Sequence, residues 1–217
     1  MKLLLTSGGL TNNSIEKALF ELVGKKSEET TLVFIPTASN VEMEDKDWFI
    51  NDLINIRKQN SKSVRITDIS AVSEDIWRPQ MEEADILFFE GGNTYHLMRW
   101  INKSGLIKIL PDLLKTKVYV GLSAGSMVTN PDLALRLSQI IYRDDMEEKP
   151  MGGLNYVDFY FLPHLNSPDF PNRMEEKIKE VAKTLSKKIY ALDDQSALKV
   201  VNGKVEIITE GKYLELN

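Results

Sequence analysis

The chain has 217 residues and a formal net charge of −5, from 27 Lys and Arg against 32 Asp and Glu, and 42% of its residues are hydrophobic. This composition is typical of a soluble globular protein. A mildly acidic chain lacks the basic stripe that nucleic acid or an anionic membrane surface would attract, so neither is an expected partner. The absence of cysteine excludes a disulfide framework, a thiolate metal site and a cysteine nucleophile.

The apolar segments of the chain are short. Met1–Leu5 is too short for the core of a signal peptide, and no run approaches the roughly 18 residues of a membrane span. The sequence therefore predicts a cytoplasmic protein. Because no linker, composition shift or repeat divides the chain, it also predicts a single domain over residues 1–217.

Short apolar runs alternate with stretches of helical period, which is typical of βα units and a mostly parallel sheet with helices on both faces. The predicted strands are Lys2–Thr6, Thr31–Pro36, Val64–Ile69, Asp85–Phe89, Lys117–Gly121 and Val157–Leu162. The predicted helices cover Ile15 to Val23, with Asn12 or Asn13 as the cap and Gly24 as the end, about Asp45–Lys58, a stretch after Thr94, and Asn172–Ser186.

The last thirty or so residues change character and predict an antiparallel extension on the edge of the sheet. Four β-forming segments follow one another, and Asn202-Gly203 between the second and third is a strong hairpin signal. The segments are Ile189–Leu192, Ala197–Val201, Lys204–Ile208 and Tyr213–Leu216.

The motif that carries chemistry is Gly121-x-Ser123-x-Gly125, which follows an apolar strand and precedes small and apolar residues. This is the pattern of a nucleophile elbow, in which glycines allow a sharp strand-to-helix turn that exposes the serine hydroxyl. The turn also directs the N–H of Ala124 toward a developing oxyanion. The alternative is an ordinary tight turn with a buried serine.

A serine nucleophile needs a base, and the chain has two histidines. His164 follows the Val157–Leu162 run and is predicted on a loop at the end of a strand, where active sites of open α/β sheets form. His96 is predicted in the first turn of a helix, where a structural role is favoured. His164 is therefore the candidate base.

The acid that would orient His164 has four candidates between Ser123 and His164: Asp132, Asp144, Asp145 and Asp158. Asp145 or Asp144 is favoured because its segment is polar and predicted as a loop. Asp158 begins a predicted strand, at the opposite end of the sheet.

A glycine pair, Gly91-Gly92, follows another predicted strand. It suits either a phosphate cradle at a helix N-terminus or a second oxyanion donor opposite Ala124, and the absence of a complete nucleotide-binding motif favours the oxyanion donor. With two separated histidines and no cysteine, neither a metal site nor a cofactor is expected.

These segments resemble the peptidase E family, serine dipeptidases that cleave after an N-terminal aspartate and are related to cyanophycinase. The matching segments are Gly91–Thr94, Gly121–Ser126, Pro163-His164 and Ala191–Ala197. The resemblance implies a fold like that of class I glutamine amidotransferases, with serine as the nucleophile. The chain reads Leu-Pro-His-Leu at 162–165 where the aspartyl dipeptidases read Asn-Pro-His-Phe.

The resemblance also implies a role for individual residues. Ser123 would be the nucleophile, His164 the base and Asp145 the acid, and the N–H groups of Gly92 and Ala124 would form the oxyanion hole. Asn93 and Arg173 would contact the substrate, with Arg173 binding the carboxylate of an N-terminal aspartate.

The predicted function is therefore a serine peptidase acting on short peptide substrates, including dipeptides with N-terminal aspartate. The alternatives are a serine ester or amide hydrolase of non-peptide substrates and a non-catalytic binding module on the same fold. The sequence leaves the oligomeric state open, with a homodimer as one alternative.

Overall fold

A computed structural model describes residues 1–133 and 152–217 of the chain. The strands are β1 (Lys2–Thr6), β2 (Thr31–Ile35), β3 (Ser63–Ile66), β4 (Ile86–Phe89), β5 (Val118–Leu122), β6 (Tyr160–Leu162), β7 (Ile189–Leu192), β8 (Ser196–Val201), β9 (Lys204–Thr209) and β10 (Tyr213–Leu216). The helices are α1 (Asn13–Val23), α2 (Asp47–Lys58), α3 (Glu74–Glu83), α4 (Thr94–Lys103), α5 (Leu106–Leu113), α6 (Ala124–Met127) and α8 (Glu175–Ala182). Two 3-10 turns lie at Ser27–Glu29 and Pro171–Arg173.

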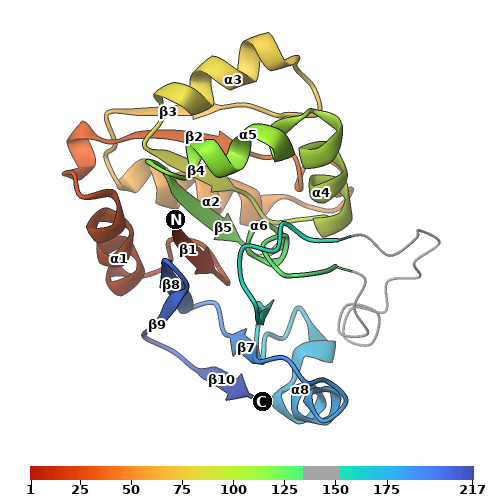
Figure 1. The fold of residues 1–217 in the computed structure, drawn as a ribbon. Coiled ribbons are helices and arrows are strands. Elements are labelled where there is room, and N and C mark those ends of the chain that lie inside the picture. Colours follow the sequence, from red (N-terminus) through yellow and green to blue (C-terminus); the bar gives the residue numbers. More distant parts are fainter. Residues whose placement is uncertain (134–151) are drawn as a thin grey trace.

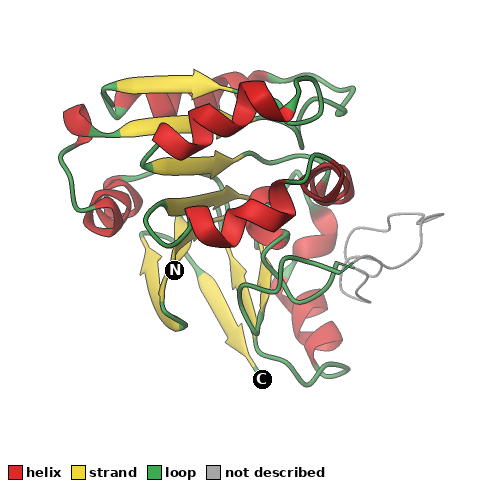
Figure 2. Ribbon diagram, turned by 45° about the horizontal axis from the view of Figure 1, so that its top comes forward, coloured by secondary structure: helices red, strands yellow, loops and turns green. Residues whose placement is uncertain are grey.

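Seven of the described strands form a sheet in the order β3-β2-β4-β5-β1-β8-β9 (Figures 1 and 2). The first five strands in this order are parallel, whereas β8 and β9 form an antiparallel hairpin beside β1. The carboxyl ends of β4, β5 and β1 are therefore adjacent. The loops that leave these three strands meet at one edge of the sheet, where open α/β sheets bind ligands.

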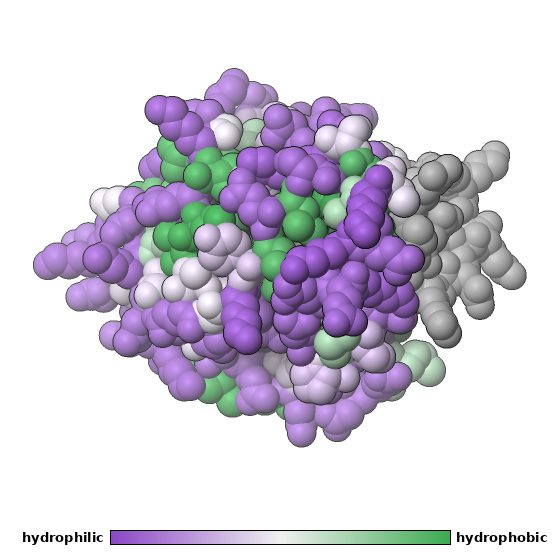
Figure 3. All heavy atoms as spheres, turned by 90° about the horizontal axis from the view of Figure 1, so that it is seen from below, coloured by the Kyte–Doolittle hydropathy of each residue, from purple (hydrophilic) through white to green (hydrophobic). Residues whose placement is uncertain are grey.

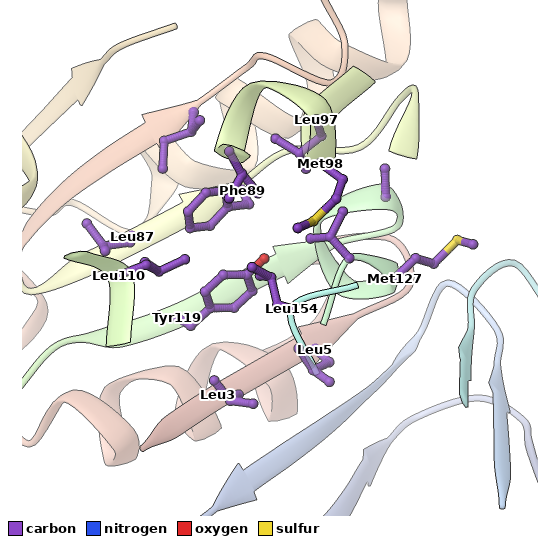
Figure 4. Close-up of a cluster of buried hydrophobic side chains, with 14 of the residues drawn as sticks. Leu3, Leu5, Leu87, Phe89, Leu97, Met98, Leu110, Tyr119, Met127 and Leu154 are labelled. Carbon is purple, nitrogen blue, oxygen red and sulfur yellow. The ribbon is translucent and has the colours of Figure 1, made fainter. Parts of the chain in front are cut away.

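Apolar side chains cover both faces of this sheet. On one face, α3, α4 and α5 contribute Trp77, Leu97 and Leu110 to a core of buried side chains. In this core the rings of Phe89 and Tyr119 stack with their centroids 4.6 Å apart (Figure 4). On the other face, α1 and α2 bury side chains such as those of Ile15, Leu19 and Ile56. The expectation of a three-layer α/β fold with helices on both faces is confirmed.

Local signals placed several boundaries correctly. Asn12 caps α1 by accepting a hydrogen bond from the N–H of Ile15, and Gly24 ends the helix with a φ of 76°. Asn202 and Gly203 both have positive φ at the β8–β9 turn, as the hairpin signal requires. The helices α3 and α5 were not predicted from the sequence. Each contains a proline, and a proline inside an apolar pattern indicates a break in the helix.

The second sheet is a departure from the sequence analysis. The run predicted as Val157–Leu162 is a strand only from Tyr160, and it pairs with β7 in a three-stranded sheet, β10-β7-β6. The helix α8 covers this small sheet and forms a separate core with it, which includes Ile178 and Val181. These strands are therefore not an extension of the main sheet.

Figure 3 views the molecule from the side of β10 and α8, where hydrophilic side chains cover most of the surface and hydrophobic ones form small separate areas. Within residues 1–133 and 152–217, no helix is long and apolar enough to cross a bilayer.

Candidate active site

The strand-to-helix turn at the end of β5 holds Ser123 in a strained conformation, with a φ of 46° and a ψ of −104°. Its carbonyl accepts hydrogen bonds from the N–H groups of Ser126 and Met127, at 3.0 and 2.9 Å. A Cβ at Gly121 would lie 2.5 Å from Ser126 N, and one at Gly125 would lie 2.1 Å from Phe89 O. Only glycine fits at these two positions, so the motif forms the elbow that the sequence predicts.

His164 lies after β6 of the small sheet, next to Pro163, and has a φ of 63°. Its Nε2 lies 2.9 Å from Ser123 Oγ. Figure 1 shows α6 at the tip of β5, with the chain of the small sheet passing close by. The structure thus places the predicted nucleophile and base within hydrogen-bonding distance, although they come from different sheets.

The acid bonded to His164 is Asp194, whose Oδ1 lies 2.6 Å from His164 Nδ1. Asp194 lies in the turn from β7 to β8, which carries the chain from the small sheet to the main sheet. Ser7, directly after β1, donates its hydroxyl to Asp194 Oδ1 at 2.7 Å and accepts the N–H of His164 at 2.7 Å. Ser7, at the end of β1, therefore holds both His164 and Asp194 in place.

Asp194 occupies the position for which the sequence analysis selected Asp145. Both Asp145 and Asp144 lie outside the described residues, and Asp132 accepts a hydrogen bond from the hydroxyl of Tyr160 at 3.3 Å. The sequence did contain a signal for Asp194, because Asp193 and Asp194 follow the apolar segment Ile189–Leu192 and lie in the Ala191–Ala197 segment that matches the family. The four candidates that the sequence offered lie between Ser123 and His164, whereas Asp194 follows His164 along the chain.

Burial lowers the pKa of His164, and the nearby charge of Arg173 acts in the same direction, while the hydrogen bond to Asp194 opposes the shift. Burial alone would raise the pKa of Asp194. Its hydrogen bonds with His164 and Ser7, together with the charges of His164 and Arg173, hold this pKa below the usual value. At neutral pH the imidazole is therefore neutral and the carboxylate ionised. These are the protonation states that a general base and its orienting acid require.

The predicted oxyanion donors flank the serine. Ala124 is the first residue of α6, so its N–H has no acceptor within the helix. Gly92 has a φ of 120°, and a Cβ there would lie 2.5 Å from Ala38 O. A Cβ on Gly91 would lie 3.4 Å from Ser123 Cβ, so the turn after β4 runs directly against the nucleophile.

Arg173 is 4% exposed and donates a hydrogen bond from Nη1 to Pro163 O at 2.9 Å. Its guanidinium carbon lies 4.2 Å from the ring centroid of Phe170. That ring in turn stacks on the imidazole of His164 at 4.4 Å, with the planes 11° apart. Arg173 therefore supports the histidine loop as well as lining the cavity beside it.

The other two sequence candidates have structural roles. Asn93 caps α4, because its side chain accepts a hydrogen bond from the N–H of His96 at 2.8 Å, and it also lines the cavity. The imidazole of His96 lies at an angle to the ring of Trp100, with the ring centroids 6.3 Å apart, and His96 is not among the cavity-lining residues.

A cavity of about 840 Å³ opens over Ser123 and His164. Its size suits a small ligand such as a short peptide. Among the residues that the structure describes, no group of three His, Cys, Asp or Glu side chains is arranged to hold a metal ion.

The fold and this site define an α/β protein in which a strained serine meets a histidine–aspartate pair at the carboxyl edge of a parallel sheet. Residues 3–208 match the sequence profile of Peptidase family S51, and the chain belongs to this family. It is 27% identical over 186 residues to an uncharacterized peptidase of Pasteurella multocida, with 83% of this chain and 86% of that protein covered. It is 32% identical over 103 residues to peptidase E of Shewanella oneidensis, which covers 46% of this chain and 41% of that protein.

Solved structures show the same fold. A Listeria monocytogenes protein described as a peptidase E candidate superimposes with a TM-score of 0.77 and 26% identity, covering 97% of this chain and 98% of that one. A peptidase from an acI-B1 Actinobacterium, 16% identical, has a TM-score of 0.69 over 99% of this chain and 93% of that one.

Proposed function

We propose that this S51 family member is a serine peptidase that hydrolyses short peptides. The observation that carries the proposal is the continuous hydrogen-bonded series from Ser123 Oγ through the His164 imidazole to Asp194 Oδ1, at 2.9 and 2.6 Å, at the mouth of the cavity. Such a series activates a serine hydroxyl that is otherwise a weak nucleophile.

In this mechanism Ser123 Oγ attacks the scissile carbonyl carbon while His164 Nε2 takes the hydroxyl proton. Asp194 accepts the Nδ1–H and stabilises the imidazolium. The N–H groups of Gly92 and Ala124 donate to the oxyanion of the tetrahedral intermediate. His164 then gives the proton to the leaving amine, and water releases the acyl group from Ser123 by the same steps.

Dipeptides with N-terminal aspartate are the first substrates to examine. Arg173 lines the cavity, and a guanidinium can donate two parallel hydrogen bonds to a carboxylate. The name peptidase E is also carried by some of the relatives.

Two measurements test the proposal. A fluorophosphonate probe should label Ser123, and a dipeptide panel run beside acyl esters should show preferential cleavage of peptides. Ser123→Ala and His164→Ala should each reduce turnover by about 10³-fold or more, as in related triads. The matched control is His96→Ala, which removes the other histidine and should keep most of the activity. Unchanged turnover in a folded Ser123→Ala variant, or cleavage of esters alone, contradicts the proposal.

A further inference from the structure

Beside the proposed catalytic residues, the end of β4 and helix α2 bring two carboxyl groups together. Glu90 directly follows β4 and is fully buried, and its carboxyl group interacts with the carboxyl group of Asp52 and with the backbone of Gly91. Burying a carboxyl group costs free energy, and placing a second one beside it adds to that cost, so the pair calls for an explanation. Its neighbour Asp52 lines the cavity.

Asp52 is close to the elbow. A Cβ placed on Gly9, in the turn after β1, would lie 2.7 Å from Leu122 Cδ1 and 3.5 Å from Asp52 Oδ1. Leu122 is the residue before the nucleophile. Asp52 therefore lies beside the turn after β1 and close to the elbow, in the wall of the cavity that Ser123 also lines.

Burial and a neighbouring charge oppose the ionisation of Asp52. Burial raises the pKa of Asp52 to about 7 and the charge of Asp194 acts in the same direction, while the hydrogen bond with Glu90 opposes the shift. Burial and the charge of Asp52 hold the pKa of Glu90 well above its usual range, which favours its protonated form. A cation bound at Asp52 would offset these effects and favour the ionised carboxylate.

We infer that Asp52, with Glu90 behind it, binds an ammonium group of the substrate; the inference rests on the proposed peptidase function. An ammonium group supplies three N–H donors and a positive charge, which matches a carboxylate that has an acidic neighbour. A free peptide amino terminus is separated from the first carbonyl by a single carbon, so it suits the position of Asp52 beside the elbow. A lysine side chain is the other source of the same group.

Binding of an ammonium group should also release a proton from Asp52. Because binding and ionisation of Asp52 are linked, a bound ammonium lowers the pKa of Asp52, and the complex forms with proton release below pH 7 or so. Glu90 and Asp194 are the titratable groups that act on Asp52, and Asp194 is ionised throughout this range. A residue with only a structural role would not produce this proton release.

The experiment uses the full chain carrying Ser123→Ala, so that peptides bind without turnover, and calorimetry at pH 6.5 in buffers of different ionisation enthalpy. The ligands are Ala-Ala, N-acetyl-Ala-Ala and N-acetyl-Lys-Ala. We expect Ala-Ala to bind at least tenfold more tightly than N-acetyl-Ala-Ala, with proton release. Adding Asp52→Asn should abolish both the preference and the proton release, whereas Asp169→Asn, which changes another cavity-lining carboxylate, should keep both.

Tight, Asp52-dependent binding of N-acetyl-Lys-Ala would identify a lysine side chain as the ammonium group. Equal affinities for all three ligands, no binding of any of them, or a preference that survives Asp52→Asn would overturn the inference. The proposed function is tested separately by labelling of Ser123 in the unmodified chain. Labelling without an ammonium preference contradicts only the binding site at Asp52, and an ammonium preference without labelling contradicts only the peptidase proposal.

Discussion

The two sides of the candidate active site are held in place by different kinds of force. On the nucleophile side, close backbone contact fixes the elbow, because a Cβ on Gly121 or Gly125 would overlap backbone atoms within 2.6 Å. On the histidine side, side-chain interactions position the imidazole. Ser7 bonds both the main chain of His164 and the carboxylate of Asp194, and Phe170 stacks on the ring.

The difference affects how each side tolerates change. Steric fixation by backbone cannot be relaxed without moving a strand of the main sheet, so errors there should unfold the protein or distort its core. Hydrogen bonds and ring stacking can be lost singly, and the fold remains. Substitutions on the histidine side should therefore reduce activity in steps while stability changes little.

The largest effect is expected from Gly125→Ala. The added methyl group would lie 2.1 Å from Phe89 O, in the strand next to β5, so the free energy of unfolding should fall by about 3 kcal/mol or more. Urea or thermal unfolding measures it. Gly152→Ala is the matched control, because a Cβ there meets no atom within 4 Å, and its effect should stay within about 0.5 kcal/mol. Equal stability of the two variants would show that the elbow is not sterically fixed.

On the histidine side, Asp194→Asn should leave the fold intact and reduce kcat by roughly 10³- to 10⁴-fold, because an amide cannot stabilise the imidazolium and favours the wrong tautomer. Steady-state kinetics on any cleaved peptide measures this. Asp145→Asn, which changes the acid selected from the sequence, should retain most of the activity. The opposite pattern would return the role of the acid to Asp145.

This contrast also explains what could be predicted from the sequence. The nucleophile side is local: the spacing of Gly121, Ser123 and Gly125 and the preceding apolar run specify both the turn and its position at the sheet edge. Most main-sheet strands were likewise predicted within a few residues, because buried parallel strands have continuous apolar runs.

The histidine side is not local. Asp194 reaches His164 because β7 pairs with β6, and pairing between strands about thirty residues apart leaves no periodic signal in either segment. For the same reason the sequence placed the β6 run in the main sheet. The carboxyl pair of Asp52 and Glu90 is equally distant in sequence, and each residue by itself suggests an ordinary solvated acid.

Substitution of Arg173 tests whether the groups stacked behind His164 contribute individually to catalysis. Arg173→Met removes the charged donor to Pro163 O and the cation beside Phe170, so kcat should fall about tenfold, the scale of one charge-assisted hydrogen bond. Since the charge of Arg173 lowers the pKa of His164, the acid limb of the kcat profile should also move to higher pH. Arg173→Lys, which keeps the charge, should restore the limb. An additional loss confined to Asp-Xaa dipeptides would support the substrate-binding role, and an unchanged kcat and pH profile would exclude a positioning role.

The smallest expected effect concerns the pH dependence of the unmodified chain. The base must be neutral to accept the proton of Ser123, so activity is lost as the pH falls through the pKa of His164. Because burial and Arg173 lower this pKa, the acid limb of kcat should have its midpoint below about 6.5, the value of a free imidazole, and kcat should be constant through neutral pH.

The profile of kcat is the one to measure, because kcat/KM would also report the ionisation of Asp52 in the free enzyme, whose pKa is raised to about 7. In Asp52→Asn the two profiles should therefore coincide. A kcat limb near pH 7 or above would mean that the bond to Asp194 outweighs burial, and that the histidine side holds the imidazolium more firmly than the neutral ring.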